Sequence, residues 1–117
     1  MRNSNTRSKT FKKKLNKSKK IFYAFSELQY RYGEILDTKD EISEIKANIK
    51  LDLEDNYTSD FYIVKTDGSV MVRECVYKDK LMKPNTIKLL DISRNYWLSK
   101  GIENWGLVLD EWIIRKG

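Results

Sequence analysis

The chain has 117 residues, of which 40% are hydrophobic and 34% are charged. This length suits one domain and leaves no room for a second folded unit of ordinary size. No apolar run approaches the roughly 18 residues that a membrane-spanning helix needs. Residues 21–25 are also too few for a signal-peptide core of about 7–15 residues. We therefore expect a soluble intracellular protein.

Histidine is absent, and Cys75 is the only cysteine. These two facts exclude serine–histidine hydrolases, His-dependent nucleases, His-ligated zinc sites, intrachain disulfides and Cys-rich zinc clusters. Any bound metal must have oxygen ligands, which favours magnesium or manganese.

The net charge of +6 is concentrated near the N-terminus, because residues 1–20 carry nine Lys or Arg and no acid. Residues 21–117 carry fourteen basic and seventeen acidic residues. We expect a flexible basic arm with a nascent helix over 9–20 that contacts nucleic-acid phosphates. The alternative is a solubilising tail. The basic residues of the arm are Arg2, Arg7, Lys9, Lys12, Lys13, Lys14, Lys17, Lys19 and Lys20.

Helical spacing of apolar residues predicts a first helix within 22–36, and Ser26 is a candidate N-cap. Residues 37–41 indicate a turn. Alternation at Ile49, Leu51 and Leu53 predicts a strand, and residues 54–58 indicate a loop.

The second half predicts a strand over 61–65, a hairpin turn at Asp67-Gly68 and a strand over about 69–77. A helix follows Pro84 and ends near Gly101, and a last strand covers 105–109. A short tail spans 111–117. The order of helix, three strands, helix and strand predicts a mixed α/β fold with a central sheet.

Glu74 lies on a strand face that otherwise contains valines, and a carboxylate there is costly unless it is paired or binds a metal. The hairpin brings Asp60 close to Glu74 across the strand pair. Glu27, at the start of the first helix, is a plausible third carboxylate. A shared divalent ion would relieve their repulsion and activate a water for attack on phosphorus. Alternatively, Glu74 pairs with a lysine and Asp60 caps a turn.

The order Ser26-Glu27, then residues 57–61, Asp67-Gly68 and residues 72–74 resembles the nuclease domain of TnsA-type transposon endonucleases. These belong to the PD-(D/E)xK superfamily of restriction-endonuclease-like nucleases. The resemblance covers roughly residues 22–110. It implies a mixed central sheet flanked by helices and magnesium-dependent hydrolysis of DNA phosphodiester bonds, with manganese as the other option.

The resemblance also implies a role for each matched residue. Glu27 would help to position metal, Asp60 would bridge the metals, and Glu74 would be the second strand carboxylate. The main-chain carbonyl of Cys75 would complete the coordination.

One departure concerns the lysine expected two residues after Glu74, where this sequence has Val76. That lysine would stabilise developing negative charge or orient the attacking water. Lys78 lies on the same strand face but about 13 Å from Glu74 along an extended strand. Lys88, on the following helix, is the better substitute. If neither reaches, the protein binds without cutting.

The leading hypothesis is therefore a small DNA endonuclease. The resemblance suggests that it comes from a mobile element or a phage, so we expect it in the cytoplasm of a bacterial or phage-infected cell. We expect a partner protein that supplies targeting and no association with a membrane. Whether the chain forms a homodimer is left undecided. The alternative is an inactive nuclease-fold protein that inhibits or adapts a nucleoprotein machine. A third, weaker option is action on RNA.

Overall fold

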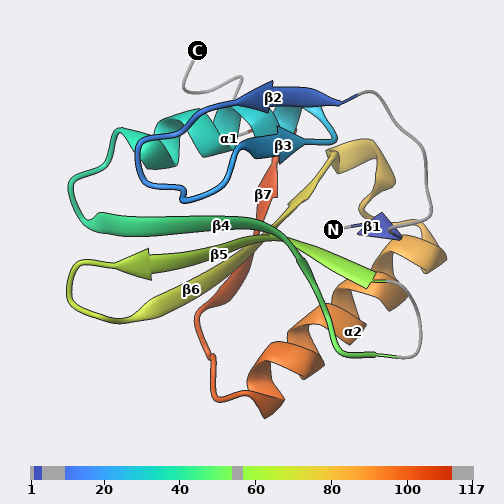
Figure 1. Cartoon of the computed structure of the whole chain (residues 1–117). Coiled ribbons are helices and arrows are strands. Elements are labelled where there is room, and N and C mark those ends of the chain that lie inside the picture. The colour runs from blue at the N-terminus through green and yellow to red at the C-terminus, as the bar shows by residue number, and fades with distance from the viewer. Residues whose placement is uncertain (1, 4–9, 54–56, 112–117) are drawn as a thin grey trace.

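The computed structural model describes residues 2–3, 10–53 and 57–111 of the chain. Within them, helices α1 and α2 lie on opposite sides of a mixed sheet (Figure 1), which confirms the expected mixed α/β fold with flanking helices. The elements in chain order are β1 (Arg2–Asn3), β2 (Phe11–Lys13), β3 (Phe22–Ala24), α1 (Glu27–Asp37), β4 (Ile42–Lys50), β5 (Tyr57–Lys65), β6 (Val70–Val76), the 3-10 helix η1 (Lys78–Lys80), α2 (Pro84–Ser99) and β7 (Trp105–Leu109).

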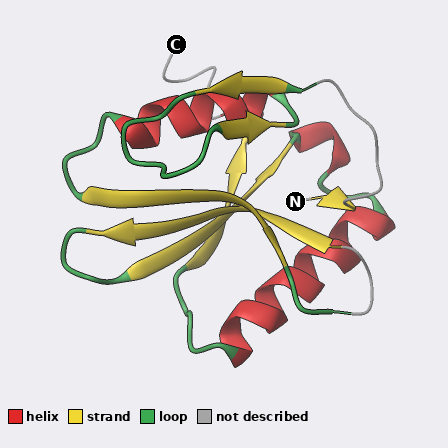
Figure 2. Ribbon diagram, viewed as in Figure 1, coloured by secondary structure: helices red, strands yellow, loops and turns green. Residues whose placement is uncertain are grey.

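The main sheet is antiparallel except at one edge. β5 pairs antiparallel with β4 on one side and with β6 on the other, whereas β6 and β7 are parallel. The parallel pair is connected through α2, as parallel neighbours require a long crossover. Figure 2 shows the strands fanning out from the middle of the sheet. The expected hairpin at Asp67-Gly68 is present, and Gly68 has the positive φ of 87° that favours glycine.

Each face of the sheet has its own core. The core under α1 contains Phe22, Leu28, Ile45 and Phe61, each at most 2% exposed. The core under α2 contains Leu51, Tyr57, Val72 and Trp97. The stripe predicted for the first helix is largely confirmed, because α1 begins after the Ser26 cap and buries Leu28, Tyr32 and Leu36.

Strands β4 and β5 each exchange the face that they present to the two cores partway along their length. Ile45 and Ala47 join the α1 core, but Ile49 joins the α2 core, although all three would share one face of a regular strand. Asn48 breaks the alternation with a φ of 55°, a left-handed conformation that asparagine tolerates better than most residues. In the partner strand, Tyr57 joins the α2 core and Ser59 bonds to Trp97 of α2, whereas Phe61 joins the α1 core, so the exchange falls at Asp60.

This exchange explains why the strand predicted around residues 49–53 is displaced in the structure. β4 begins at Ile42 and ends at Lys50. A register shift between Ile42 and Glu44 adds a second interruption. The register shift disturbs the period-2 pattern at the start of β4, and Asn48 disturbs it near the end of the strand. Tyr57 and Thr58, expected in a loop over 54–58, belong to β5, which begins at Tyr57, and residues 54–56 lie outside the described residues.

Residues 10–20 pack on the folded body, which corrects the expectation of a flexible arm with a helix over 9–20. β2 pairs antiparallel with β3, and the Leu15 side chain is 1% exposed in the α1 core. The main-chain N–H groups of Asn16 and Lys17 each donate to the Asp37 carboxylate at 2.9 Å. Two apolar side chains, Phe11 and Leu15, suffice to anchor a segment whose composition is dominated by lysine. The part of the arm over 4–9 lies outside the described residues.

Candidate functional site

The last paired residues of β5 and β6 are Phe61 and Arg73, and the next opposed residues are Asp60 and Glu74. The two strands separate at this point, which is called the fork of the sheet below. Beyond this point β5 pairs instead with β1, at Tyr57 and Thr58. The hairpin therefore brings the two carboxylates together, as the sequence predicted, at the place where two strands separate.

Each carboxylate bonds to the main chain of the opposite strand. The Asp60 N–H donates to Glu74 Oε1 at 2.8 Å, and the Cys75 N–H donates to Asp60 Oδ2 at 2.7 Å. These two bonds replace the ladder bonds that the diverging strands cannot make, so main-chain donors that would otherwise be buried and unsatisfied have acceptors.

Glu74 is fully buried and faces α2. Ser93, in the middle of that helix, donates through Oγ to Glu74 Oε2 at 2.5 Å. Burial disfavours the charged form and raises the pKa of the Glu74 carboxyl, and the neighbouring Asp60 raises it further. The valine face predicted around Glu74 is confirmed, since Val72 is 0% and Val76 is 5% exposed.

A chain of hydrogen bonds leads to Glu74 from two tryptophans. The Trp97 indole N–H donates to Ser59 Oγ at 2.8 Å, and the Trp105 indole N–H donates to Ser93 Oγ at 3.0 Å. The two serine oxygens are 3.4 Å apart. The hydrogen bonds in such a chain polarise one another, and this strengthens the bond to the Glu74 carboxylate.

A second buried polar group, Gln29 of α1, supports the fork from the other face. Its Nε2 donates to Asn48 Oδ1 at 2.9 Å and to the Asp60 carbonyl at 3.4 Å. Its Oε1 accepts from the Phe25 N–H at 2.8 Å. The glutamine thereby ties the helix start to the two residues at which β4 and β5 change faces.

The other predicted site residues lie elsewhere. Glu27 is exposed and its Oε1 is 3.1 Å from Arg31 Nε, one helical turn along α1. Across the described part of the chain, no group of three or more His, Cys, Asp or Glu side chains is close enough to hold a metal ion. The structure thus brings together Asp60, Glu74 and the Cys75 main chain, and it does not bring Glu27 into that group.

Neither candidate lysine is directed at Glu74. The Lys78 ammonium lies 3.4 Å from Glu111 Oε2. Lys88 is exposed on α2, and at about 100° per residue it is turned about 140° around the helix from Ser93, which faces Glu74.

The Cys75 side chain is half-buried. Burial, together with the Asp60 charge, raises the pKa of its thiol well above the ordinary value, so it is a weak nucleophile at neutral pH.

The basic residues of the N-terminal segment divide into two groups. Lys13 lies 2.5 Å from Glu34, Lys17 donates to the Lys39 carbonyl, and Lys19 lies 3.7 Å from Glu44. Lys12, Lys14 and Lys20 are exposed. Arg2 is placed by its main-chain pairing with Thr58, whereas Arg7 and Lys9 lie outside the described residues.

Sequence reasoning missed Gln29, Ser59 and Ser93. A signal was present for Ser93, because it interrupts the helical stripe of Leu90 and Trp97 with a small hydroxyl side chain. Gln29 gave a weaker signal, as a polar residue on the buried side of α1. Ser59 gave none, since its burial depends on the exchange of faces in β5.

Neither a protein-family model nor a curated protein sequence matches this chain. No helix within the described residues combines the length and apolarity needed to cross a membrane.

Proposed function

We propose that the chain is a small metal-dependent DNA endonuclease of the TnsA, PD-(D/E)xK type, acting with a partner protein that supplies targeting. The observation that supports this most is the convergence of Asp60 and Glu74 at the fork between β5 and β6. Two carboxylates from the two strands of one hairpin meet there, with the main chain of Cys75 beside them.

The chemistry of these donors suits a hard divalent cation, because carboxylate and carbonyl oxygens are the ligands that magnesium prefers. Asp60, Glu74 and the Cys75 carbonyl would hold the ion. When bound, it would supply an activated water and neutralise charge on the phosphate. The Asp60 N–H and Ser93 donate to the two oxygens of Glu74, and the Cys75 N–H donates to Asp60 Oδ2, so these bonds fix the orientation of both carboxylates.

A second candidate is a nuclease-fold protein that binds nucleic acid, or a nucleoprotein machine, without cutting. Val76 favours it, because a buried valine occupies the position of the expected lysine and can neither carry charge nor orient water. The ion pairs that engage Glu27 and Lys78 with other residues favour it as well.

The test is cleavage of supercoiled plasmid by the full chain with magnesium or manganese. Asp60→Asn and Glu74→Gln keep the side-chain shapes and should each lower nicking by about 100-fold or more. Glu103→Gln, an exposed carboxylate in the loop before β7, is the control and should cut normally.

Thermal melts of all four proteins separate loss of activity from loss of fold. Plasmid binding without cleavage by the wild-type chain would reject the endonuclease and support the second candidate. Cleavage that survives both substitutions would reject the Asp60–Glu74 centre. Parallel reactions with structured RNA decide between DNA and RNA as the substrate.

A further inference from the structure

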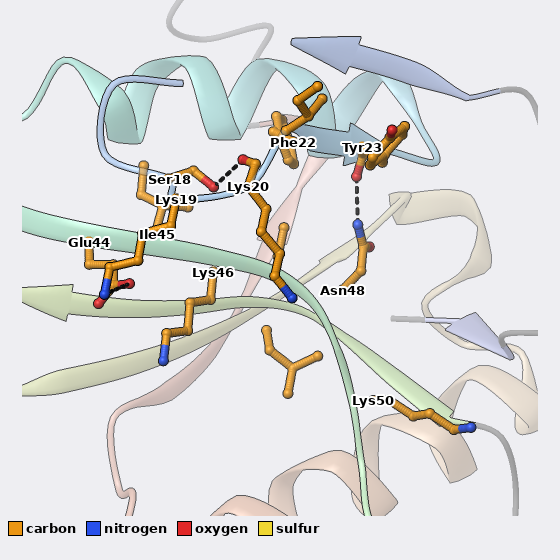
Figure 3. A pocket seen from close by; sticks show the side chains of 13 residues that line it. Ser18, Lys19, Lys20, Phe22, Tyr23, Glu44, Ile45, Lys46, Asn48 and Lys50 are labelled. Atoms are coloured by element: carbon orange, nitrogen blue, oxygen red, sulfur yellow. Dashed lines mark hydrogen bonds and ion pairs between the residues drawn. The ribbon is translucent and has the colours of Figure 1, made fainter. Parts of the chain in front are cut away.

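A hollow of about 460 Å³ lies between residues 18–23 and β4, the strand at the outer edge of the sheet (Figure 3). Its volume falls in the range of about 300–1,000 Å³ that is usual for ligand sites. Asn48 Nδ2 donates to the Tyr23 carbonyl and so connects the two walls at one end. The hollow is hereafter the β4 groove.

The lining of the β4 groove is strongly basic. Lys19 and Lys20 come from the N-terminal wall, and Lys46 and Lys50 come from β4. The Lys46 ammonium lies 5.5 Å from the centroid of the Tyr62 ring, and Lys46 and Lys50 are both exposed. Glu44 is the one acidic residue in the lining, and it lies 3.7 Å from Lys19, whose side chain remains 86% exposed. Figure 3 shows the Lys20 side chain reaching across β4. The groove therefore carries a net positive charge and favours an anionic ligand.

Apolar surface accompanies this charge. Ile21 is 50% exposed and Tyr23 is 44% exposed, and both line the groove. Lysines on an edge strand also discourage pairing with another sheet, but that role does not account for the two lysines on the opposite wall or for the exposed aromatic ring.

We infer that the β4 groove binds a single strand of nucleic acid, with the lysines on its phosphates and Tyr23 available for base stacking. Proteins that bind single strands combine a positively charged groove with aromatic side chains. A duplex keeps its bases stacked within itself and could not use the exposed ring. DNA and RNA strands share this chemistry.

The groove also connects to the carboxylate pair. Asn48 lines the groove and accepts from Gln29, which donates in turn to the Asp60 carbonyl. Asn48 therefore contacts both the groove and the glutamine that supports the fork of the sheet. The inference extends the proposed function by naming a surface for its nucleic acid, but it requires binding only and no cleavage.

The experiment measures affinity of the full chain for labelled single-stranded DNA, single-stranded RNA and duplex DNA over a range of salt concentrations. A chelator is present, so that cleavage plays no part. The groove variant is Lys46→Gln with Lys50→Gln. The matched control is Lys80→Gln with Lys83→Gln, which removes the same charge from two exposed lysines away from the groove.

The groove variant should weaken single-strand binding and lower the slope of log K against log salt by about 1.4, or about 0.7 per lost phosphate contact. The control pair should leave the slope unchanged. Tyr23→Ala should weaken binding by about 5-fold or more, and Tyr23→Phe should bind like wild type because it keeps the stacking ring.

Equal effects of the two lysine pairs would overturn the inference, as would a groove variant that affects only the duplex. An unaffected Tyr23→Ala would overturn the stacking role. If the groove variant weakens binding of single-stranded DNA and single-stranded RNA equally, the shared chemistry is supported. If it weakens binding of only one of them, that nucleic acid is identified as the ligand. A chain that fails to nick plasmid but passes these tests would reject the endonuclease alone.

Discussion

The two faces of the sheet are stabilised in different ways. Under α1, the core consists almost entirely of apolar side chains and aromatic contacts, such as Phe22 with Phe61 at a centroid distance of 5.7 Å. Under α2, a smaller apolar core surrounds a hydrogen-bonded series of Ser59, Ser93 and Glu74. Apolar packing tolerates small rearrangements, whereas a buried polar network depends on every member being satisfied. The α2 face is therefore where substitutions should have specific electrostatic consequences.

The largest effect is expected from Leu15→Ala, which tests whether the basic N-terminal segment is part of the α1 core. Leu15 is 1% exposed, so truncation should lower the free energy of unfolding by about 2–5 kcal/mol. Urea unfolding followed by tryptophan fluorescence measures the loss. Leu53→Ala, at a side chain that is 40% exposed, is the control and should change stability by less than about 0.5 kcal/mol. Equal effects at the two positions would contradict the packing described for residues 10–20.

Gly33→Ala tests how tightly α1 packs on the same core. An added Cβ would lie 2.5 Å from Phe22 Cε2, and the Phe22 ring is only 2% exposed. The overpacked core should lose about 1–3 kcal/mol of stability. The double variant Gly33→Ala with Phe22→Leu removes the clashing ring atoms, so its cost should be less than the sum of the two single costs. Additive costs in urea unfolding would place the clash elsewhere.

Ser93→Ala tests the polar network of the α2 face. It removes the donor to Glu74 and the acceptor for the Trp105 indole, and it should cost about 1–3 kcal/mol because two buried groups lose a partner. Ser99→Ala is the control within the same helix, where the hydroxyl bonds only to the Tyr96 carbonyl near the exposed end. The shape of the Trp fluorescence spectrum should change in Ser93→Ala and stay unchanged in Ser99→Ala. Identical stability losses would show that the network contributes nothing.

Glu74→Gln gives the smallest but most specific effect, a change in pH dependence. Because burial raises the folded-state pKa of Glu74, the native state retains a proton that the unfolded chain has already released. The unfolding free energy of the wild type should therefore fall as pH rises from the unfolded-state pKa to the raised folded-state pKa, by up to about 1.4 kcal/mol per pH unit, and should not change further above it. The glutamine variant lacks this slope, so its stability relative to wild type should increase from acid to neutral pH.

Thermal melts from acid to neutral pH measure this difference, with Glu103→Gln as an exposed control that should follow the wild type. Parallel curves for wild type and Glu74→Gln would mean that the carboxylate ionises normally in the folded protein.

The amino-acid sequence by itself determined the elements whose cause is local. Ser26 caps α1 by accepting the Gln29 N–H, Pro84 begins α2, and Gly101 ends it with a φ of 83°. The Asp67-Gly68 turn determined the register of β5 and β6, and that register was enough to predict the meeting of Asp60 and Glu74. Such features need only a few adjacent residues, because caps and tight turns are satisfied within the segment itself.

Only the tertiary structure decided which groups complete the site. Ser93, Gln29 and Ser59 reach the fork because two helices and an irregular pair of strands converge there, and Asn48 takes a conformation that no periodicity foretells. Equally, the burial of Leu15 follows from long-range packing. The partners of these side chains depend on which distant surfaces fold against them, and spacing along the chain does not specify those surfaces.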